Sequence, residues 1–120
     1  MKPGPRALIA YVAGCLSRAN AASAVYDYSE GGYRMVSGTV SPQNVNVFDY
    51  KDGCHFSGSG SGSQLSLYHY GEGAHLTLNL RQNQFSGYDY GTGDHFSGSV
   101  SGNNVTLYDY GEGAYFNYSV

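Results

Sequence analysis

The chain has 120 residues, a formal net charge of −3, and large shares of glycine (18 residues) and tyrosine (13 residues). This length accommodates one domain rather than several. The acidic balance repels phosphate groups, so the composition excludes nucleic acid as a partner.

The first 24 residues predict an export signal peptide with a helical centre. Lys2 and Arg6 precede the ten-residue apolar run ALIAYVAGCL without any acidic residue, and small residues follow in SRANAASA. A basic start, an apolar centre and a small-residue end are typical of secretory signals. The run is too short for a permanent membrane span. We therefore expect an exported protein of bacterial type, located in the periplasm, on the cell surface or outside the cell.

Three fates of this segment stay open from the sequence. Ala-x-Ala sites end at Ala21 and at Ala24, where ordinary signal cleavage would occur. The stretch VAGC is similar to a bacterial lipobox, which makes Cys15 an alternative lipidation site. The third fate is a retained N-terminal helix. We take residues 25–120 as the working domain.

Loss of residues 1–24 would make the remainder more acidic. Arg34, Lys51 and Arg81 are its three Lys and Arg side chains, against nine carboxylates, a net charge of 3 − 9 = −6. No long apolar stretch follows, so we expect no membrane span after signal removal. Ordinary cleavage leaves Cys54 as a single cysteine, which excludes an internal disulfide.

From residue 25 onward the chain repeats one motif built on Tyr-x-Tyr. A fixed period near 20 residues indicates a repeat architecture. We divide this single β-repeat domain into the units 25–46, 47–66, 67–86, 87–106 and 107–120. The second tyrosines of the motif are spaced by 22, 20, 20 and 20 residues: Tyr28, Tyr50, Tyr70, Tyr90 and Tyr110.

Each unit has the pattern of two short strands. In NNVTLYDY, Val105 and Leu107 alternate with polar or aromatic neighbours, and HFSGSVS places Phe96 and Val100 on one face. A period of two is typical of half-buried strands. Helix is disfavoured because glycine, serine and asparagine dominate and no 3.6-residue pattern occurs.

Two kinds of turn separate these strands. One is the Gly-x-Gly after the tyrosines, where glycine tolerates positive φ. The other is a two-residue hairpin turn, such as Gly102-Asn103. If both are hairpin turns, Val100 pairs with Val105 and Leu107 pairs with Phe116, so that the apolar side chains share one face of the sheet.

The predicted fold class is therefore all-β. We expect ten strands in an antiparallel meander that curls into a barrel or sandwich, preceded by the signal-peptide helix. A β-solenoid is the alternative, because tyrosine and asparagine ladders suit stacked coils. Stacking Asp89 under Asp109 would cost electrostatic energy in a solenoid, whereas a meander places these carboxylates two strands apart.

In this organisation the chain resembles secreted amyloid-forming subunits of the curli type, which also combine a signal peptide with strand-turn-strand repeats. The resemblance covers residues 25–120. The glutamine and asparagine positions of those repeats are not reproduced, so the resemblance assigns no functional residue here.

One histidine on the polar face recurs in each of the three middle units, and with nearby carboxylates these form a candidate metal-binding row of His55, His75 and His95. Imidazole and carboxylate are common metal ligands. The spacing matches no recognised zinc pattern, and the repeat itself explains the recurrence. The nonapeptide calcium pattern is also absent. We expect no cofactor.

The tyrosines form a second candidate site, a pair of exposed stripes for a glycan or a protein partner. Flat aromatic rows beside polar side chains stack on sugar rings or on another protein. The alternative is cross-strand packing that only stabilises the sheet. The candidate ligand-binding residues are Tyr68, Tyr70, Tyr88, Tyr90, Tyr108 and Tyr110.

No catalytic motif is present, neither a nucleophile elbow nor a phosphate loop. We therefore expect a non-enzymatic structural or interaction module. Self-association through an open strand edge or through the tyrosine face is the first hypothesis. A carbohydrate-binding surface protein and a periplasmic metal-binding protein are the alternatives.

Overall fold

The computed structural model describes all 120 residues and consists of one helix followed by ten strands. The ten strands form a closed antiparallel barrel in which each strand pairs with its neighbours in sequence. The elements are α1 (Pro3–Arg18), β1 (Ala24–Asp27), β2 (Gly32–Val40), β3 (Asn44–Asp49), β4 (Cys54–Ser61), β5 (Gln64–His69), β6 (Ala74–Arg81), β7 (Gln84–Asp89), β8 (Asp94–Ser101), β9 (Asn104–Asp109) and β10 (Ala114–Ser119).

The meander prediction is confirmed, and the solenoid alternative is wrong. Val100 pairs with Val105, and Phe116 pairs with Leu107, in the register that the hairpin turns require. The barrel closes where Tyr26 and Asp27 of β1 pair with β10. Closure leaves no strand edge of the meander free.

Alternation of side chains decides which face of each strand lies inside. Along β9, Val105, Leu107 and Asp109 are buried, while Asn104 is exposed and Tyr108 is half-buried. The same in-and-out pattern recurs in β3, β5 and β7 because their sequences have the same period of two. The apolar side chains therefore point into the barrel.

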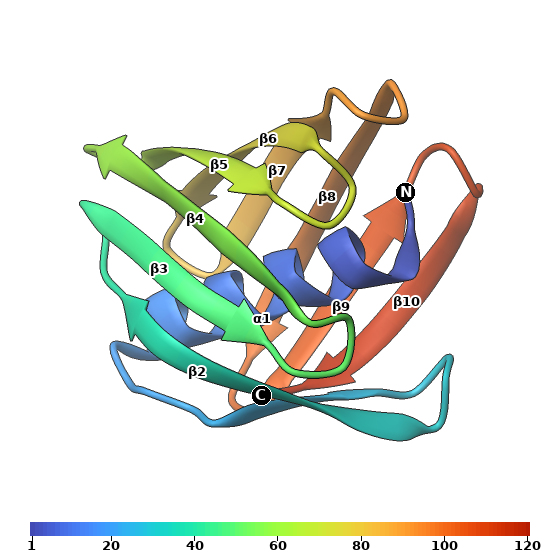
Figure 1. The fold of residues 1–120 in the computed structure, drawn as a ribbon, viewed down its shortest axis with the longest axis horizontal. Coiled ribbons are helices and arrows are strands. Elements are labelled where there is room, and N and C mark those ends of the chain that lie inside the picture. Colours follow the sequence, from blue (N-terminus) through green and yellow to red (C-terminus); the bar gives the residue numbers. More distant parts are fainter.

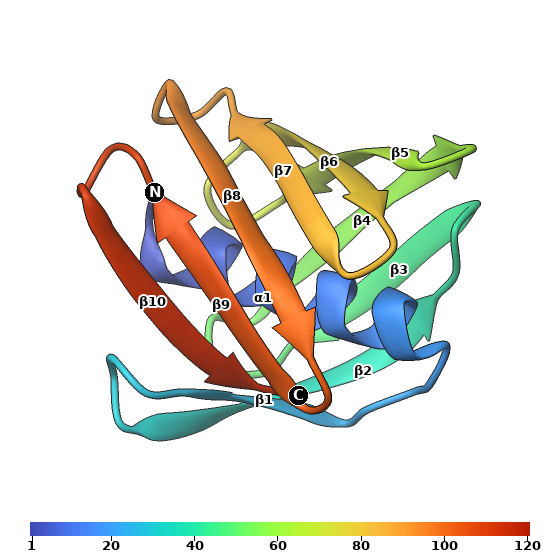
Figure 2. The same ribbon diagram turned by 180° about the vertical axis from the view of Figure 1, so that it is seen from behind.

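Helix α1 fills the interior of this barrel. Figures 1 and 2, which view the molecule from opposite sides, both show α1 within the ring of strands. Pro3 occupies the start of the helix, where its missing N–H costs no hydrogen bond, and the helix ends at Ala19 in the left-handed conformation. Gly4 to Cys15 are all buried, as expected for a helix that is apolar on every side from Ala7 onward.

The helix and the strands share one hydrophobic core of 25 buried residues. Nine of these precede β1: Met1, Ala7, Leu8, Ile9, Ala10, Tyr11, Val12, Ala13 and Cys15. In the intact chain, residues 1–18 therefore belong to the packed structure. That residues 1–24 are removed during export stays a prediction. No helix of the chain has the length and apolar character needed to cross a bilayer.

The second glycine of each Gly-x-Gly turn has a conformation that side chains disfavour. Gly93 has a φ of 74°, and its N–H donates to the Asp89 carbonyl oxygen at 2.8 Å. We expect Gly93→Ala to lower the free energy of unfolding by about 1–2 kcal/mol, because a left-handed residue with a Cβ is strained.

Urea denaturation of the full chain measures this change. Gly32→Ala is the matched control, since Gly32 lacks a positive φ and has open space around its Cβ position. The control should be neutral or slightly stabilising. Equal destabilisation by both substitutions would contradict the assignment of strain to the turn.

Candidate functional site

Every repeat unit places a cluster of three aromatic rings on the outside of the barrel. The two aromatic residues of each motif, Phe48 and Tyr50 in one unit and two tyrosines in the others, point outward together because they are two residues apart at the end of a strand. The register then adds a third ring from the next strand; Tyr115, for example, lies opposite Tyr108. Ring centroids within the five clusters are 4.6 to 5.0 Å apart in edge-to-face arrangements.

The tyrosines predicted as stripes lie on this outer surface. Tyr70, Tyr90 and Tyr110 are 59 to 64% exposed. Their partners Tyr68, Tyr88 and Tyr108 are half-buried, because a ring from the following strand packs against each of them. Cross-strand packing and an exposed stripe therefore coexist. One tyrosine of each pair packs against a ring of the neighbouring strand, and the other faces solvent.

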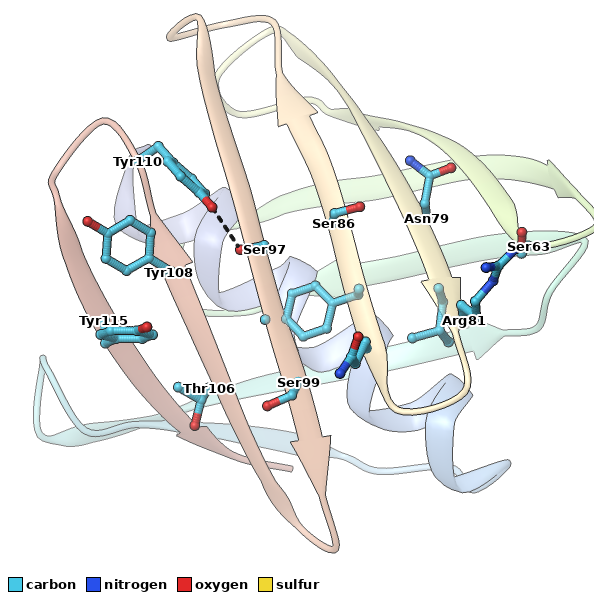
Figure 3. A pocket seen from close by; sticks show the side chains of 14 residues that line it. Ser63, Asn79, Arg81, Ser86, Ser97, Ser99, Thr106, Tyr108, Tyr110 and Tyr115 are labelled. Atoms are coloured by element: carbon cyan, nitrogen blue, oxygen red, sulfur yellow. Dashed lines mark hydrogen bonds between the residues drawn. The ribbon is translucent and has the colours of Figure 1, made fainter.

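A hollow on the outer face of β6–β10 adjoins the last aromatic cluster and is shown in Figure 3. Its volume is about 790 Å³. The small side chains of Ser86, Ser97 and Ser99 form its floor, whereas Tyr108 and Tyr110 form one wall. The Tyr110 hydroxyl lies 3.5 Å from the Ser97 hydroxyl.

A second hollow, of about 500 Å³, continues this surface toward Tyr88 and His95. It shares Asn79, Ser86, Ser97 and Tyr110 with the first. Together the two hollows offer hydroxyl and amide groups beside aromatic rings. Aromatic rings beside hydroxyl and amide groups have the chemistry needed for stacking on, and hydrogen bonding to, a flat, hydroxyl-rich molecule.

The three histidines of the candidate metal row are exposed on β4, β6 and β8, each separated from the next by an intervening strand. His75 and His95 pack their rings against Tyr68 and Tyr88, at centroid distances of 4.7 and 4.6 Å. No three His, Cys, Asp or Glu side chains converge as metal ligands. The structure therefore places His55, His75 and His95 in the aromatic clusters and does not bring them together.

The sequence analysis missed a ring of polar side chains. It lies inside the barrel, at the end that carries the aromatic clusters and the turns that follow them. The middle residue of each Tyr-x-Tyr points inward, opposite to the tyrosines. Continued alternation from Val105 and Leu107 to Asp109 is the signal that places it there. All five members are at most 1% exposed: Asp27, Asp49, His69, Asp89 and Asp109.

Each ring member caps the turn that follows it. Asp109 Oδ1 accepts a hydrogen bond from the Gly111 N–H at 2.9 Å, and Asp89 does the same for Gly91 at 2.8 Å. His69 Nδ1 accepts from the Glu72 N–H at 3.0 Å. These contacts explain why the motif carries aspartate before the glycines, since an Asx-type cap stabilises a tight turn.

The remaining carboxylate oxygens of the ring need positive charge. Arg34, 2% exposed, donates to Asp49 Oδ2 at 2.7 Å, and its guanidinium lies 2.9 Å from Asp52. The N-terminal ammonium of Met1 donates to Asp109 Oδ2 at 3.0 Å. Oδ2 of Asp27 is buried without a hydrogen-bond partner. The ring is therefore a mouth of the barrel lined by carboxyl groups, of which those of Asp49 and Asp109 have cationic partners.

The fold also brings Cys54 beside His69, with Sγ 3.6 Å from Nε2. Burial raises the pKa of the Cys54 thiol, and burial lowers the pKa of His69 below its usual 6.5 although Glu72 and Asp52 oppose the shift. Both shifts disfavour a thiolate–imidazolium pair, which a nucleophilic cysteine requires. Cys15, the alternative lipidation site, is buried in α1.

We expect the stability of the intact chain to fall as pH drops below about 6.5, the pKa of unfolded histidine. Because the pKa of folded His69 is lower, the unfolded chain binds the extra proton first. The stabilisation that neutral His69 contributes is complete above the pKa of histidine in the unfolded chain. It is lost as the pH falls through the pKa of His69 in the folded chain. Protonation of Nδ1 also removes the acceptor for the Glu72 N–H.

Thermal unfolding between pH 7.5 and pH 5 measures this dependence. His69→Asn should flatten the pH profile, because asparagine caps the turn without titrating. His75→Asn is the control, since it changes an exposed histidine and leaves His69 in place. Identical profiles for the wild type and His69→Asn would show that another group carries the pH dependence.

Comparison with known proteins gave no match, whether against protein-family models, curated proteins or solved structures.

Proposed function

We propose that this chain is an exported, non-enzymatic binding module that takes a neutral carbohydrate in the hollow on β6–β10. The single observation that carries the proposal is the exposed face of Tyr110 beside a hollow floored by hydroxyl groups. Sugar rings present flat apolar C–H faces for stacking and hydroxyl groups for hydrogen bonding.

The lining of the hollow supports an uncharged ligand. Of its 14 lining residues, Arg81 alone carries a charge, and Asn79, Gln84 and Thr106 add donors and acceptors. Such a surface suits hydroxyl groups better than carboxylates or phosphates. The protonated Cys54 thiol and neutral His69 support the non-enzymatic part of the proposal.

Self-association is the second candidate function, through the exposed tyrosines. Self-association through an open strand edge is not available, because β1 pairs with β10 and occupies that edge. The exposed tyrosines of the five clusters remain, and exposed aromatic rings are enriched in protein interfaces. Export is an expectation from residues 1–24 and is common to both candidate functions. It leaves open whether the chain is cleaved in the ordinary way or lipidated at Cys15. Metal binding by His55, His75 and His95 has the least support, because these side chains lie apart.

The carbohydrate proposal predicts that Tyr110→Ala weakens glycan binding at least about tenfold, the loss of about 1.4 kcal/mol expected for one stacked aromatic ring. The full chain is screened against neutral oligosaccharides of glucose, galactose and N-acetylglucosamine. Hits are then titrated by calorimetry.

Tyr50→Ala is the matched control for this substitution. Tyr50 occupies the equivalent position of another repeat, is 61% exposed against 59% for Tyr110, and likewise approaches a serine hydroxyl, that of Ser37 at 3.1 Å. It does not line the hollow. Equal losses from both substitutions, or no glycan bound at all, would reject the hollow as a carbohydrate site. Concentration-dependent oligomers that are disrupted by both Tyr110→Ala and Tyr50→Ala would favour self-association.

A further inference from the structure

The inside of the barrel is lined by apolar side chains, which pack against the apolar helix α1. The strands contribute sixteen of the 25 core residues, among them Phe56, Leu76 and Leu107, all completely buried against the helix or one another. The ring of strands is closed by its own hydrogen bonds, without any from α1. The barrel and the helix are thus separate units that meet only through side chains and a few terminal contacts.

The helix runs from one end of the barrel to the other. At its start, the Met1 ammonium contacts Asp109 at the end that carries the Gly-x-Gly turns. At its other end, the Ser17 hydroxyl donates to Asn83 in the opposite hairpin turn at 2.7 Å, and Arg18 donates to the Val120 carbonyl. The occupant therefore spans the whole lumen.

The mouth of the lumen recognises positive charge at the head of this rod. The Met1 ammonium donates to Asp94 at 3.1 Å and to Asp109 at 3.0 Å. Arg6 also donates to Asp109 at 3.1 Å and to the Tyr118 hydroxyl at 3.2 Å, and its guanidinium lies 3.5 Å over the Phe116 ring. Charge-assisted hydrogen bonds in a buried site are strong and directional.

An independent observation is that two buried polar atoms of the barrel, Asp27 Oδ2 and Arg34 Nε, have no hydrogen-bond partner. Asp27 is 1% exposed, and its Oδ2 has no hydrogen-bond partner even with the helix in place. Without residues 1–24, Arg34 would be the single guanidinium left for the buried carboxylates of Asp27, Asp49, Asp89 and Asp109. Such a mouth favours a cationic occupant.

The connection between helix and barrel is short and exposed. Residues 19–21 and Ser23 are exposed, and Ala21 is one of the two predicted cleavage positions. A cut here would sever the covalent link and leave the contacts of Met1 and Arg6 with the barrel in place, whereas the hydrogen bond from the Tyr11 hydroxyl to the Ala22 carbonyl joins the helix to the cut segment itself.

We propose that the lumen is a binding site for an apolar helix of about four turns that begins with a positively charged group, and that residues 1–18 are its resident ligand. In the intact chain the ligand is tethered. After a cut in residues 19–23 it is exchangeable for a second helix of the same chemistry. This site is independent of the outer hollow.

The test begins with the full chain carrying a protease recognition sequence inserted between Asn20 and Ala21. The folded protein is cut, and an excess of a fluorescent peptide of residues 1–18, labelled at its C-terminus, is added. Fluorescence anisotropy follows its uptake, and native mass spectrometry identifies the exchanged complex. We expect saturable, one-to-one exchange.

The comparison peptide has an acetylated N-terminus and Arg6→Gln, so that its apolar face is unchanged while the two cationic groups that contact Asp109 are lost. We expect it to bind at least about tenfold more weakly. Asp109→Asn in the barrel should bring the two affinities closer together, because this carboxylate contacts both cationic groups. Tyr118→Phe is a milder second variant, which removes one hydrogen bond of Arg6 without changing a buried charge.

Failure of the labelled peptide to enter the cut barrel would overturn the proposal. Equal binding of the two peptides to the wild-type barrel would overturn it as well, since the cationic head would then have no role. Neither result bears on glycan binding in the outer hollow, so the two proposals fail separately.

Discussion

Leu8→Asp is expected to unfold the intact 120-residue chain at room temperature or to lower its free energy of unfolding by at least about 4 kcal/mol. Leu8 is completely buried in α1 at the centre of the shared core. A carboxylate there has no partner and no water. Because small domains are stable by only about 5–15 kcal/mol, this loss removes most of the margin.

Circular dichroism and urea denaturation of the full chain measure the effect. Asn20→Asp is the matched control, since it introduces the same charge in the exposed linker. The control should change stability by less than about 0.5 kcal/mol. If Leu8→Asp behaved like this control, α1 would have no place in the core of the intact chain.

Arg34→Met is expected to lower the free energy of unfolding by about 3–5 kcal/mol, because it leaves a buried carboxylate without its partner. Asp49 is completely buried, and the guanidinium of Arg34 is 2.7 Å from its Oδ2. Asp52 also loses its contact, but that carboxylate is 41% exposed and water replaces the guanidinium there.

A second substitution identifies the cause. Adding Asp49→Asn to Arg34→Met should recover part of the loss, because asparagine keeps the cap on the Lys51 N–H and removes the uncompensated charge. Arg81→Met, at an exposed position, is the control for loss of a guanidinium. Urea denaturation of the wild type, Arg34→Met, Asp49→Asn and the double variant gives the coupling energy. Additive effects of Arg34→Met and Asp49→Asn would contradict the role assigned to this ion pair.

The repeating motif now has two roles that share one end of the barrel. Its tyrosines form the outer clusters, and its central aspartate caps a turn and contributes to the inner ring. Tyr110 and Asp109 are adjacent in sequence, yet one is 59% exposed and the other is completely buried. Alternation along a strand is sufficient to separate them.

Local sequence determined the strands, their pairing and their turns. A period of two fixed the faces, and Gly102-Asn103 fixed the register of Val100 on Val105, because a two-residue turn permits one register. The exposed tyrosines and histidines followed from the same alternation. These features depend on residues close together in the chain, so they were predictable.

Only the tertiary structure decided how the sheet closes, what fills it and where its outer face is hollow. Meander and solenoid share the same alternation, and the choice depends on β1 meeting β10, segments at opposite ends of the sheet. An apolar segment that follows Lys2 and Arg6 has the pattern of an export signal in any context. Its place in the lumen depends on long-range packing against Phe56, Leu76 and other inward side chains, and on Asp109 for the charge of Met1. Such contacts between distant residues leave no local pattern in the sequence.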